Sequence, residues 1–229
     1  MVTGRFRGIR PADLRSVAMA ERGRLPRPDA RGEGDVLRML RTGTAAEHAA
    51  LERSLDLLDP ALDRTRLTRV LERMHGFWQS AEAGLDAWAG RFPTDARSVS
   101  WQHRRRAGLF AADLATLGAS GASAGPDLPP PAGTDEAMGR LYVLEGSTLG
   151  GTFIDRHLAT VPELAGLRLR AFSPYGPETG VMWHGFRRAA RARVAAGGDA
   201  GTMVVSARQT FGALAMWCGP AAAGARMHA

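Results

Sequence analysis

The segment 139–154 is apolar and has the periodicity of a helix, yet it carries glycine at four positions. Each glycine inside a helix costs about 1 kcal/mol relative to alanine. Gly139, Gly146 and Gly150 are spaced so that they share one face of a helix, and Gly151 lies beside them. A face without side chains allows close packing of a second helix, or lets a large flat molecule lie against the backbone. Both interpretations are open from this segment alone.

A second segment, residues 41–52, places His48 and Glu52 four residues apart. On a helix, one ring nitrogen of His48 then reaches the carboxylate, which fixes the tautomer and makes the opposite nitrogen a better metal ligand. Thr44 and Arg41 share that face, and the arginine could hold a carboxylate of the same ligand. A lone histidine on a helix is more often a surface residue or a satisfied core residue, so this segment alone is weak evidence for a ligand.

Taken together, the two segments resemble the heme oxygenase family, specifically its bacterial, biliverdin-producing branch associated with bacterial phytochromes. The pattern Thr-x-x-x-His-x-x-x-Glu is similar to the proximal helix of that family. The run Tyr-Val-Leu-Glu-Gly-Ser-Thr-Leu-Gly-Gly is similar to the bacterial form of its distal helix. The likeness covers about residues 36–218 and also includes the stretches 106–118, 172–186 and 207–217.

The resemblance implies an all-α, single-domain, multi-helix heme oxygenase-like fold with heme between a proximal helix and a glycine-rich distal helix. His48 would ligate the iron, and Gly146 and Gly150 would face it from the distal side. Heme would be both cofactor and substrate, cleaved with O2 and external electrons to biliverdin, CO and ferrous iron. Animal and plant members carry a distal aspartate where this chain has Ser147, so the implied catalytic set is Gly146, Ser147 and Gly150.

The same resemblance guides the expected heme contacts. Arg41 and Arg188 are candidates for the heme propionates, which need cations. Phe153 stands seven residues after Gly146, falls on the glycine face and is the side chain expected to touch the porphyrin. The complete expected heme-binding set is Arg41, Thr44, His48, Glu52, Gly151, Phe153, Tyr175 and Arg188.

The formal net charge is +7, and all 30 basic side chains are arginine. This composition is typical of a GC-rich genome, so it gives only modest support for nucleic-acid binding, and no DNA-binding motif is recognisable. The runs 104–106 and 187–188 are typical of solvated helix faces. A basic surface would steer acidic electron donors such as ferredoxin or flavodoxin, the partners implied by the resemblance, with a bacterial phytochrome as a possible acceptor of biliverdin.

The chain has one cysteine, Cys218, which fits a reducing compartment and is expected to be a buried filler. No apolar run approaches the roughly 20 residues that span a membrane, and the Arg-rich start lacks the apolar core of a secretory signal. These features predict a cytoplasmic protein that binds neither membrane nor nucleic acid.

The sequence predicts three parts: a loose Arg/Gly/Pro-rich arm over 1–33, a helical domain over 34–219 and a frayed tail over 220–229. Asp63 is the expected N-cap of the second helix, and the proline-rich stretch 118–133 is expected to be a long loop. No alternation typical of a sheet is present. Helices are expected at 35–57, 64–89, 100–118, 135–158, 180–196 and 202–217.

Three other functions are open on the same residues. One is a heme-binding or heme-transfer protein without turnover. Another is a non-heme di-iron oxidase on the same fold, because Glu72 and His75 have the spacing of a di-iron ligand motif. That site would need further carboxylates and histidines, and no second Glu-x-x-His occurs. The third is a basic helical nucleic-acid binder, which would show salt-sensitive retention on DNA.

Overall fold

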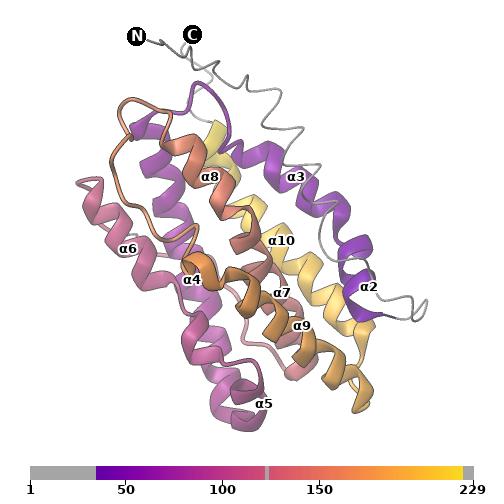
Figure 1. Cartoon of the computed structure of the whole chain (residues 1–229). Coiled ribbons are helices and arrows are strands. Elements are labelled where there is room, and N and C mark those ends of the chain that lie inside the picture. Colours follow the sequence, from indigo (N-terminus) through magenta and orange to yellow (C-terminus); the bar gives the residue numbers. More distant parts are fainter. Residues whose placement is uncertain (1–34, 122–123, 224–229) are drawn as a thin grey trace, which may run out of the picture. The chain divides into compact units, whose positions relative to one another are not determined.

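A computed structural model describes residues 35–121 and 124–223, with side chains as far as Gly219. These residues form helices and connecting loops without a strand, as expected (Figure 1). The predicted arm over 1–33 and residues 224–229 of the predicted tail lie outside the described part. The helices are α2 (Val36–Gly43), α3 (Ala45–Leu55), α4 (Arg64–Arg91), α5 (Pro93–Ser98), α6 (Ala107–Thr116), α7 (Thr134–Gly146), α8 (Gly151–Leu158), α9 (Thr179–Ala195) and α10 (Ala200–Ala223), with 3-10 turns η1 (Trp101–Arg104), η2 (Ser147–Gly150) and η3 (Gly176–Glu178).

The first expected helix is broken in two at Thr44. Its backbone leaves the helical region at φ −115° and ψ 5°, and its hydroxyl donates to the carbonyl of Leu40 over 2.7 Å. This back-bonding competes with the helical ladder and favours a bend. Arg41 therefore stands on α2 and His48 on α3, and the single helix expected to carry both is wrong.

The helix α4 begins where the sequence predicts. The side chain of Asp63 accepts a hydrogen bond from the backbone N–H of Arg66 over 2.6 Å, which satisfies one of the free donors of the first turn. The helix then continues through Trp78 and Trp88, both buried in the core. Its length allows it to contact α6, α7 and α10.

The glycine-rich helix is also interrupted. The expected continuous helix over 135–158 consists of α7, the 3-10 turn η2 and α8. The hydroxyls of Ser147 and Thr148 donate to the carbonyls of Leu144 and Glu145, over 2.7 and 2.8 Å. A 3-10 turn has about 3.0 residues per turn rather than 3.6. Positions after Gly146 are therefore rotated away from where α-helical spacing places them.

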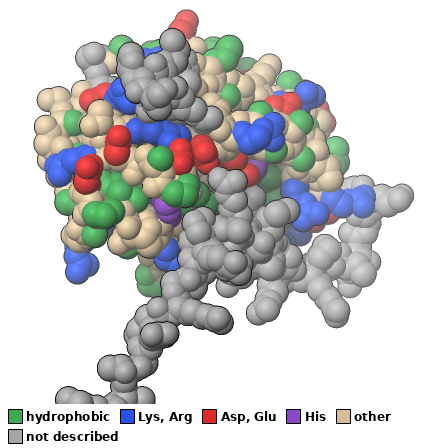
Figure 2. Space-filling view, turned by 90° about the horizontal axis from the view of Figure 1, so that it is seen from above, with side chains coloured by type: hydrophobic (Ala, Val, Ile, Leu, Met, Phe, Trp, Pro, Cys, Tyr) green, Lys and Arg blue, Asp and Glu red, His purple; other side chains and the backbone are tan. Residues whose placement is uncertain are grey.

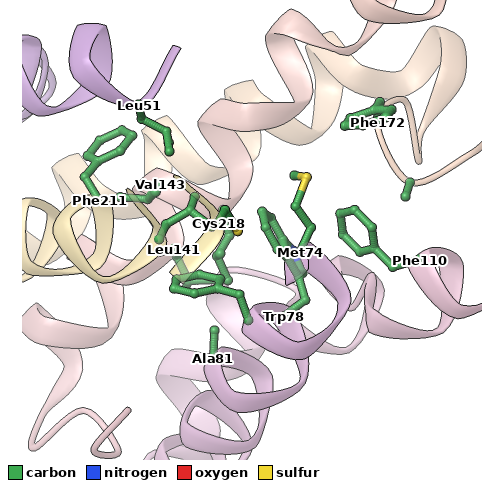
Figure 3. Packing of buried hydrophobic residues seen from close by; sticks show 14 of the residues in the cluster. Leu51, Met74, Trp78, Ala81, Phe110, Leu141, Val143, Phe172, Phe211 and Cys218 are labelled. Carbon is green, nitrogen blue, oxygen red and sulfur yellow. The ribbon is translucent and has the colours of Figure 1, made fainter. Parts of the chain in front are cut away.

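The core joins α4, α7 and α10, with α3 and α6 at its sides (Figure 3). Helix α10 packs against α2, α3, α4 and α7, and it continues six residues beyond its expected end at 217, into the predicted tail. Cys218 is fully buried, as expected, and forms no disulfide. Burial raises the pKa of its thiol to about 12. The core residues labelled in Figure 3 are Leu51, Met74, Trp78, Ala81, Phe110, Leu141, Val143, Phe172, Phe211 and Cys218.

A reciprocal contact fastens α4 to α10. The indole N–H of Trp217 donates to the carbonyl of Arg73 over 2.9 Å, and the Nε of Arg73 donates to the carbonyl of Trp217 over 2.9 Å. The guanidinium also lies 3.9 Å from the centre of the Trp217 ring. Among the described residues, no helix is both long and apolar enough to cross a membrane.

Candidate functional site

His48 and Glu52 meet on α3, as their spacing predicts. The Nδ1 atom of His48 lies 3.5 Å from Oε2 of Glu52, and the two side chains are 45% and 48% exposed. The ring packs edge-on against Phe211 of α10, with the ring centres 5.6 Å apart. Because Nδ1 is next to the carboxylate, Nε2 is the ring nitrogen that points away from Glu52. The histidine is thus oriented but not enclosed.

Helix α7 and the α2–α3 segment run in the same direction, and α10 packs against both (Figure 1). A hydrogen bond between the side chains of Thr44 and Tyr142 connects them. One helical turn further along each segment stand His48 and Gly146, respectively. The Tyr142 ring also packs 5.9 Å from Trp183 of α9. The Thr44 contact thus joins the segment that carries His48 to the helix that ends at Gly146.

The backbone at Gly146 and Gly150 faces open space. A Cβ atom added at either position would have no atom within 4 Å, apart from its own helix and chain neighbours. These two positions therefore keep the bare surface that the sequence predicts.

The other two glycines of the motif serve close packing. A Cβ on Gly139 would collide with the carbonyl of Met203 and lie 2.7 Å from the Cβ of Ser206, both on α10. A Cβ on Gly151 would collide with the carbonyl of Phe172. The expectation that all four glycines form one bare face is therefore wrong. The space in the Cβ direction of Gly151 is filled by the chain's own backbone, and its predicted role as a heme contact stays a prediction.

The carboxylate of Glu145 is buried beside the bare surface. It is 1% exposed and forms an ion pair with Arg104, itself 4% exposed. The hydroxyl of Tyr175 donates to Glu145 Oε1 over 2.8 Å, and burial together with the nearby carboxylate raises the pKa of that hydroxyl. Arg104 also donates to the carbonyl of Met182 on α9 over 3.0 Å. The hydroxyl of Tyr175, a residue predicted to bind heme, holds this carboxylate, and its contact with heme stays a prediction.

A second buried arginine, Arg106, holds the end of α7. Its side chain donates to the Leu144 carbonyl over 3.0 Å, to the Ser147 hydroxyl over 2.8 Å and to the Ala171 carbonyl over 3.1 Å. It is 2% exposed, and burial lowers the pKa of its guanidinium. The interpretation of the run 104–106 as a solvated face is therefore wrong for Arg104 and Arg106. Ser147, predicted to be catalytic, uses its hydroxyl within this network.

Two buried carboxylates support Arg106 from behind. Glu82 accepts hydrogen bonds from the backbone N–H groups of Arg106 and Ala107, over 2.6 and 2.9 Å. Asp113 accepts from the backbone N–H groups of Arg170 and Ala171, over 2.9 and 2.7 Å. Burial raises the pKa of both carboxyl groups. The segment that carries Arg106 and the loop that carries Ala171 are thus both fixed.

The remaining predicted contacts have mixed surroundings. Arg41 is exposed at the end of α2. Burial raises the pKa of the Tyr142 hydroxyl, and the nearby charge of Arg41 lowers it. Arg188 is exposed on α9. The ring of Phe153 lies 5.7 Å from the guanidinium of Arg156, one turn along α8. The Thr44 side chain is buried and occupied by hydrogen bonds within the chain.

The di-iron alternative has no site in the described part of the chain. No group of three or more His, Cys, Asp or Glu side chains there could hold a metal ion. His75 is 5% exposed, and burial lowers the pKa of its ring. Its spacing from Glu72 therefore lacks the further ligands that a di-iron centre needs.

A separate hollow of about 360 Å³ lies at the start of α7. Thr134, Asp135 and Arg193 are among the residues that line it. Arg193 pairs with both carboxylate oxygens of Asp135, over 2.7 and 3.2 Å. None of the predicted site residues lines this hollow.

Comparison with known proteins decides the fold. The structure matches the heme oxygenase of Neisseria meningitidis, solved with NO and CO bound, with a TM-score of 0.65 at 21% identity, over 82% of this chain and 92% of that one. It matches the heme oxygenase of Leptospira interrogans with a TM-score of 0.65 at 17% identity, over 81% of this chain and 99% of that one. The fold is that of the heme oxygenases.

At the level of sequence, the chain is 37% identical to a heme oxygenase of Xanthomonas campestris pv. campestris (strain 8004) over 98 residues. The match covers 42% of this chain and 55% of that relative, so it spans about half of the relative's length. No family model matches the chain.

Sequence reasoning missed the buried polar groups behind the glycine motif: Arg104, Arg106, Glu145 and Glu82. A charged residue in an unaligned sequence is assigned to the surface by default, because isolated charges are rarely buried. The available signal was the family-like stretch that begins at Arg106, where a charged residue opens an otherwise apolar run.

Proposed function

We propose that this chain is a heme oxygenase that binds heme between α3 and the α7–η2–α8 segment. The observation that carries the proposal is the bare backbone at Gly146 and Gly150, which faces open space in the turns that follow the Thr44–Tyr142 contact. His48, oriented by Glu52 and half exposed, stands one turn beyond the same contact on the facing segment. The shared fold supports this assignment.

The residues on both sides fit a heme. The Nε2 of His48 would ligate the iron, and the carboxylate at Nδ1 would fix the tautomer and strengthen the ligand. A porphyrin is flat and wide, so it needs a surface without side chains, such as the one at Gly146 and Gly150. Arg41 and Arg188 are exposed cations that would hold the propionates.

Bound heme would supply both the iron that activates O2 and the carbon ring that is oxidised. The chain's own residues would orient the heme and limit what contacts its distal side. A neutral imidazole, unlike a thiolate, leaves the fate of oxygen to the distal side. There the surface is backbone, and the carboxylate of Glu145 is held by Arg104 and Tyr175. The distal side would therefore place backbone close to the heme, in place of a strong acid or base.

The product, electron donor and location are the finer parts of the proposal. We propose a cytoplasmic enzyme that takes electrons from an acidic carrier such as ferredoxin or flavodoxin and supplies biliverdin to a bacterial phytochrome. The net charge of +7 supports an acidic carrier. Figure 2 shows arginine and acidic side chains interspersed over one face, so the support for an acidic carrier comes from the net charge of the whole chain.

The test is an absorption titration of the full chain with hemin, followed by ascorbate or a ferredoxin system in air. A one-to-one Soret band that fades while biliverdin absorption grows is the expected result. A Soret band that persists under reductant would favour a heme carrier without turnover, the second candidate. The absence of a saturable band would contradict heme binding altogether.

A further inference from the structure

The buried guanidinium of Arg106 holds the 3-10 turn between α7 and α8 from the side opposite the bare backbone. The carbonyl of Leu144 accepts hydrogen bonds from Nη1 of Arg106 over 3.0 Å and from the hydroxyl of Ser147 over 2.7 Å. The Ser147 oxygen accepts from the same Nη1 over 2.8 Å. Three groups thus share one triangle of hydrogen bonds at the first residue of η2. The triangle fixes the point where the α-helix becomes a 3-10 turn.

The other side of the same guanidinium is anchored to the loop after α8. Its Nε donates to the carbonyl of Ala171 over 3.1 Å, and its Nη2 donates to the same oxygen. The next residue, Phe172, presents its carbonyl to Gly151, where a Cβ would not fit. The guanidinium of Arg106 therefore holds both ends of η2. It bonds directly to the first end, at Ser147, and it reaches the second end, at Gly151, through the backbone of residues 171–172.

Arginine is suited to this position in a way that lysine is not. Its planar fork carries donors in fixed directions and reaches three acceptors at once, whereas an ammonium group is a compact point charge on a flexible stem. The ring faces of Trp78 and Phe110 lie 5.0 and 5.6 Å from its central carbon and hold the plane. Loss of the fork would remove the Arg106 donors from the Ala171 carbonyl and leave the Leu144 carbonyl with one donor fewer.

We propose that Arg106 is a positioning residue that holds η2 in place and thereby sets how closely the backbone of Gly146 and Gly150 approaches a bound heme. Within one short segment, the residues that bond to Arg106 alternate with the residues that face open space. A shift of Leu144 or Ser147 must therefore move the bare surface. The part that concerns heme rests on the proposed function, and the hold on η2 does not.

The first test uses hydrogen–deuterium exchange of the heme-free full chain. Arg106→Lys should speed amide exchange over residues 147–151 by about tenfold, the factor that corresponds to the loss of one buried hydrogen bond, while α4 and α10 keep their rates. The matched control is Arg105→Lys, since Arg105 is half exposed and pairs with Asp86 at the surface; it should leave all rates unchanged. Equal acceleration throughout the protein, or none at 147–151, would overturn the proposal.

A milder variant covers the case in which Arg106→Lys does not fold. Ser147→Ala removes one of the three contacts of the triangle, and it should speed exchange over the same residues by a smaller factor. Unchanged exchange in this folded variant would also overturn the proposal.

The second test adds hemin to the folded variants. If Arg106 positions the distal backbone, Arg106→Lys should shift the Soret maximum and the pH of the acid–alkaline transition, change hemin affinity less than threefold, and lower kcat more than it raises KM. Arg106→Gln should give larger shifts than the lysine variant. Unshifted spectra with accelerated exchange would overturn the heme part alone. Failure of the wild-type chain to bind hemin would instead reject the proposed function, and the exchange result would still decide the role of Arg106.

Discussion

The two sides of the Gly146–Gly151 segment are opposites in physical terms. On one side, Gly146 and Gly150 leave the backbone bare and face open space. On the other side, Ser147 is bonded to a buried arginine, and Gly151 presses against the carbonyl of Phe172. Glycines of one motif therefore have two uses, clearance for a ligand and close contact with the protein. The comparison indicates that a bare backbone surface keeps its shape for a ligand only when the protein packs rigidly against its other side.

The largest expected effect tests whether the bare side faces an iron ligand. His48→Ala should lower heme turnover by more than about 100-fold, since even loss of a ligand's partner costs 10–100-fold. The free energy of unfolding should hardly change, because the ring is half exposed. Hemin titration, turnover and urea denaturation measure the three quantities. Glu52→Gln is the milder variant and should retain the iron ligand. Normal turnover in His48→Ala would place the ligand elsewhere.

The next prediction contrasts two neighbouring glycines. Gly151→Ala should lower the free energy of unfolding by about 1–3 kcal/mol, because its methyl group collides with the Phe172 carbonyl. Gly150→Ala has open space at the same atom and should be neutral or stabilising by up to about 1 kcal/mol. Urea denaturation of both variants decides the matter. Equal destabilisation would remove the distinction between the two sides.

A larger side chain on the bare side should act on the ligand instead of the fold. Gly150→Leu should weaken hemin binding by about tenfold or more, equivalent to about 1.4 kcal/mol, with little loss of stability. Gly108→Leu is a matched control, since Gly108 is an exposed helical glycine of α6 with the same open space at its Cβ. Competition titrations with hemin measure the effect. Unchanged affinity in Gly150→Leu would exclude this face as the heme surface.

The smallest effect concerns pH on the buried side. Burial raises the pKa of Glu82 above its usual value of 4.5. Between the usual pKa and the raised one, the folded state therefore binds the proton more tightly than the unfolded state. The contribution of Glu82 to stability is therefore present at acid pH and is lost as pH rises through its folded pKa. The slope is at most about 1.4 kcal/mol per pH unit.

The measurement for Glu82 is the difference in unfolding free energy between wild type and Glu82→Gln, from urea denaturation at several pH values from 4.5 upwards. That difference should shift against the wild type as pH rises. A constant difference would show that the carboxyl group has the same pKa in both states.

Local signals account for the parts of the structure that were predicted from sequence. The N-cap at Asp63, the contact between His48 and Glu52 and the burial of Cys218 depend on spacing and residue type within one or two turns. The all-helical fold follows from long periodic segments of the same kind.

The parts that were not predicted depend on distant residues. The 3-10 turn after Gly146 involves Arg106, some 40 positions earlier, and the difference between Gly150 and Gly151 depends on Phe172. Helical spacing alone therefore predicted a continuous helix through Phe153 and gave Gly151 the wrong surroundings. Partners for a buried charge cannot be found from pattern, because the chain must first fold to bring them together.

The place of α10 in the sequence has a consequence for the timing of heme uptake. It follows every other described helix, yet it packs against α2, α3, α4 and α7 and supports the ring of His48 through Phe211. A ribosome that has completed α9 has therefore made the histidine and the glycines but not the helix that holds them together. If the proposed function is correct, we expect heme capture to begin only after α10 has emerged, so that a nascent chain would not hold heme before it can process it.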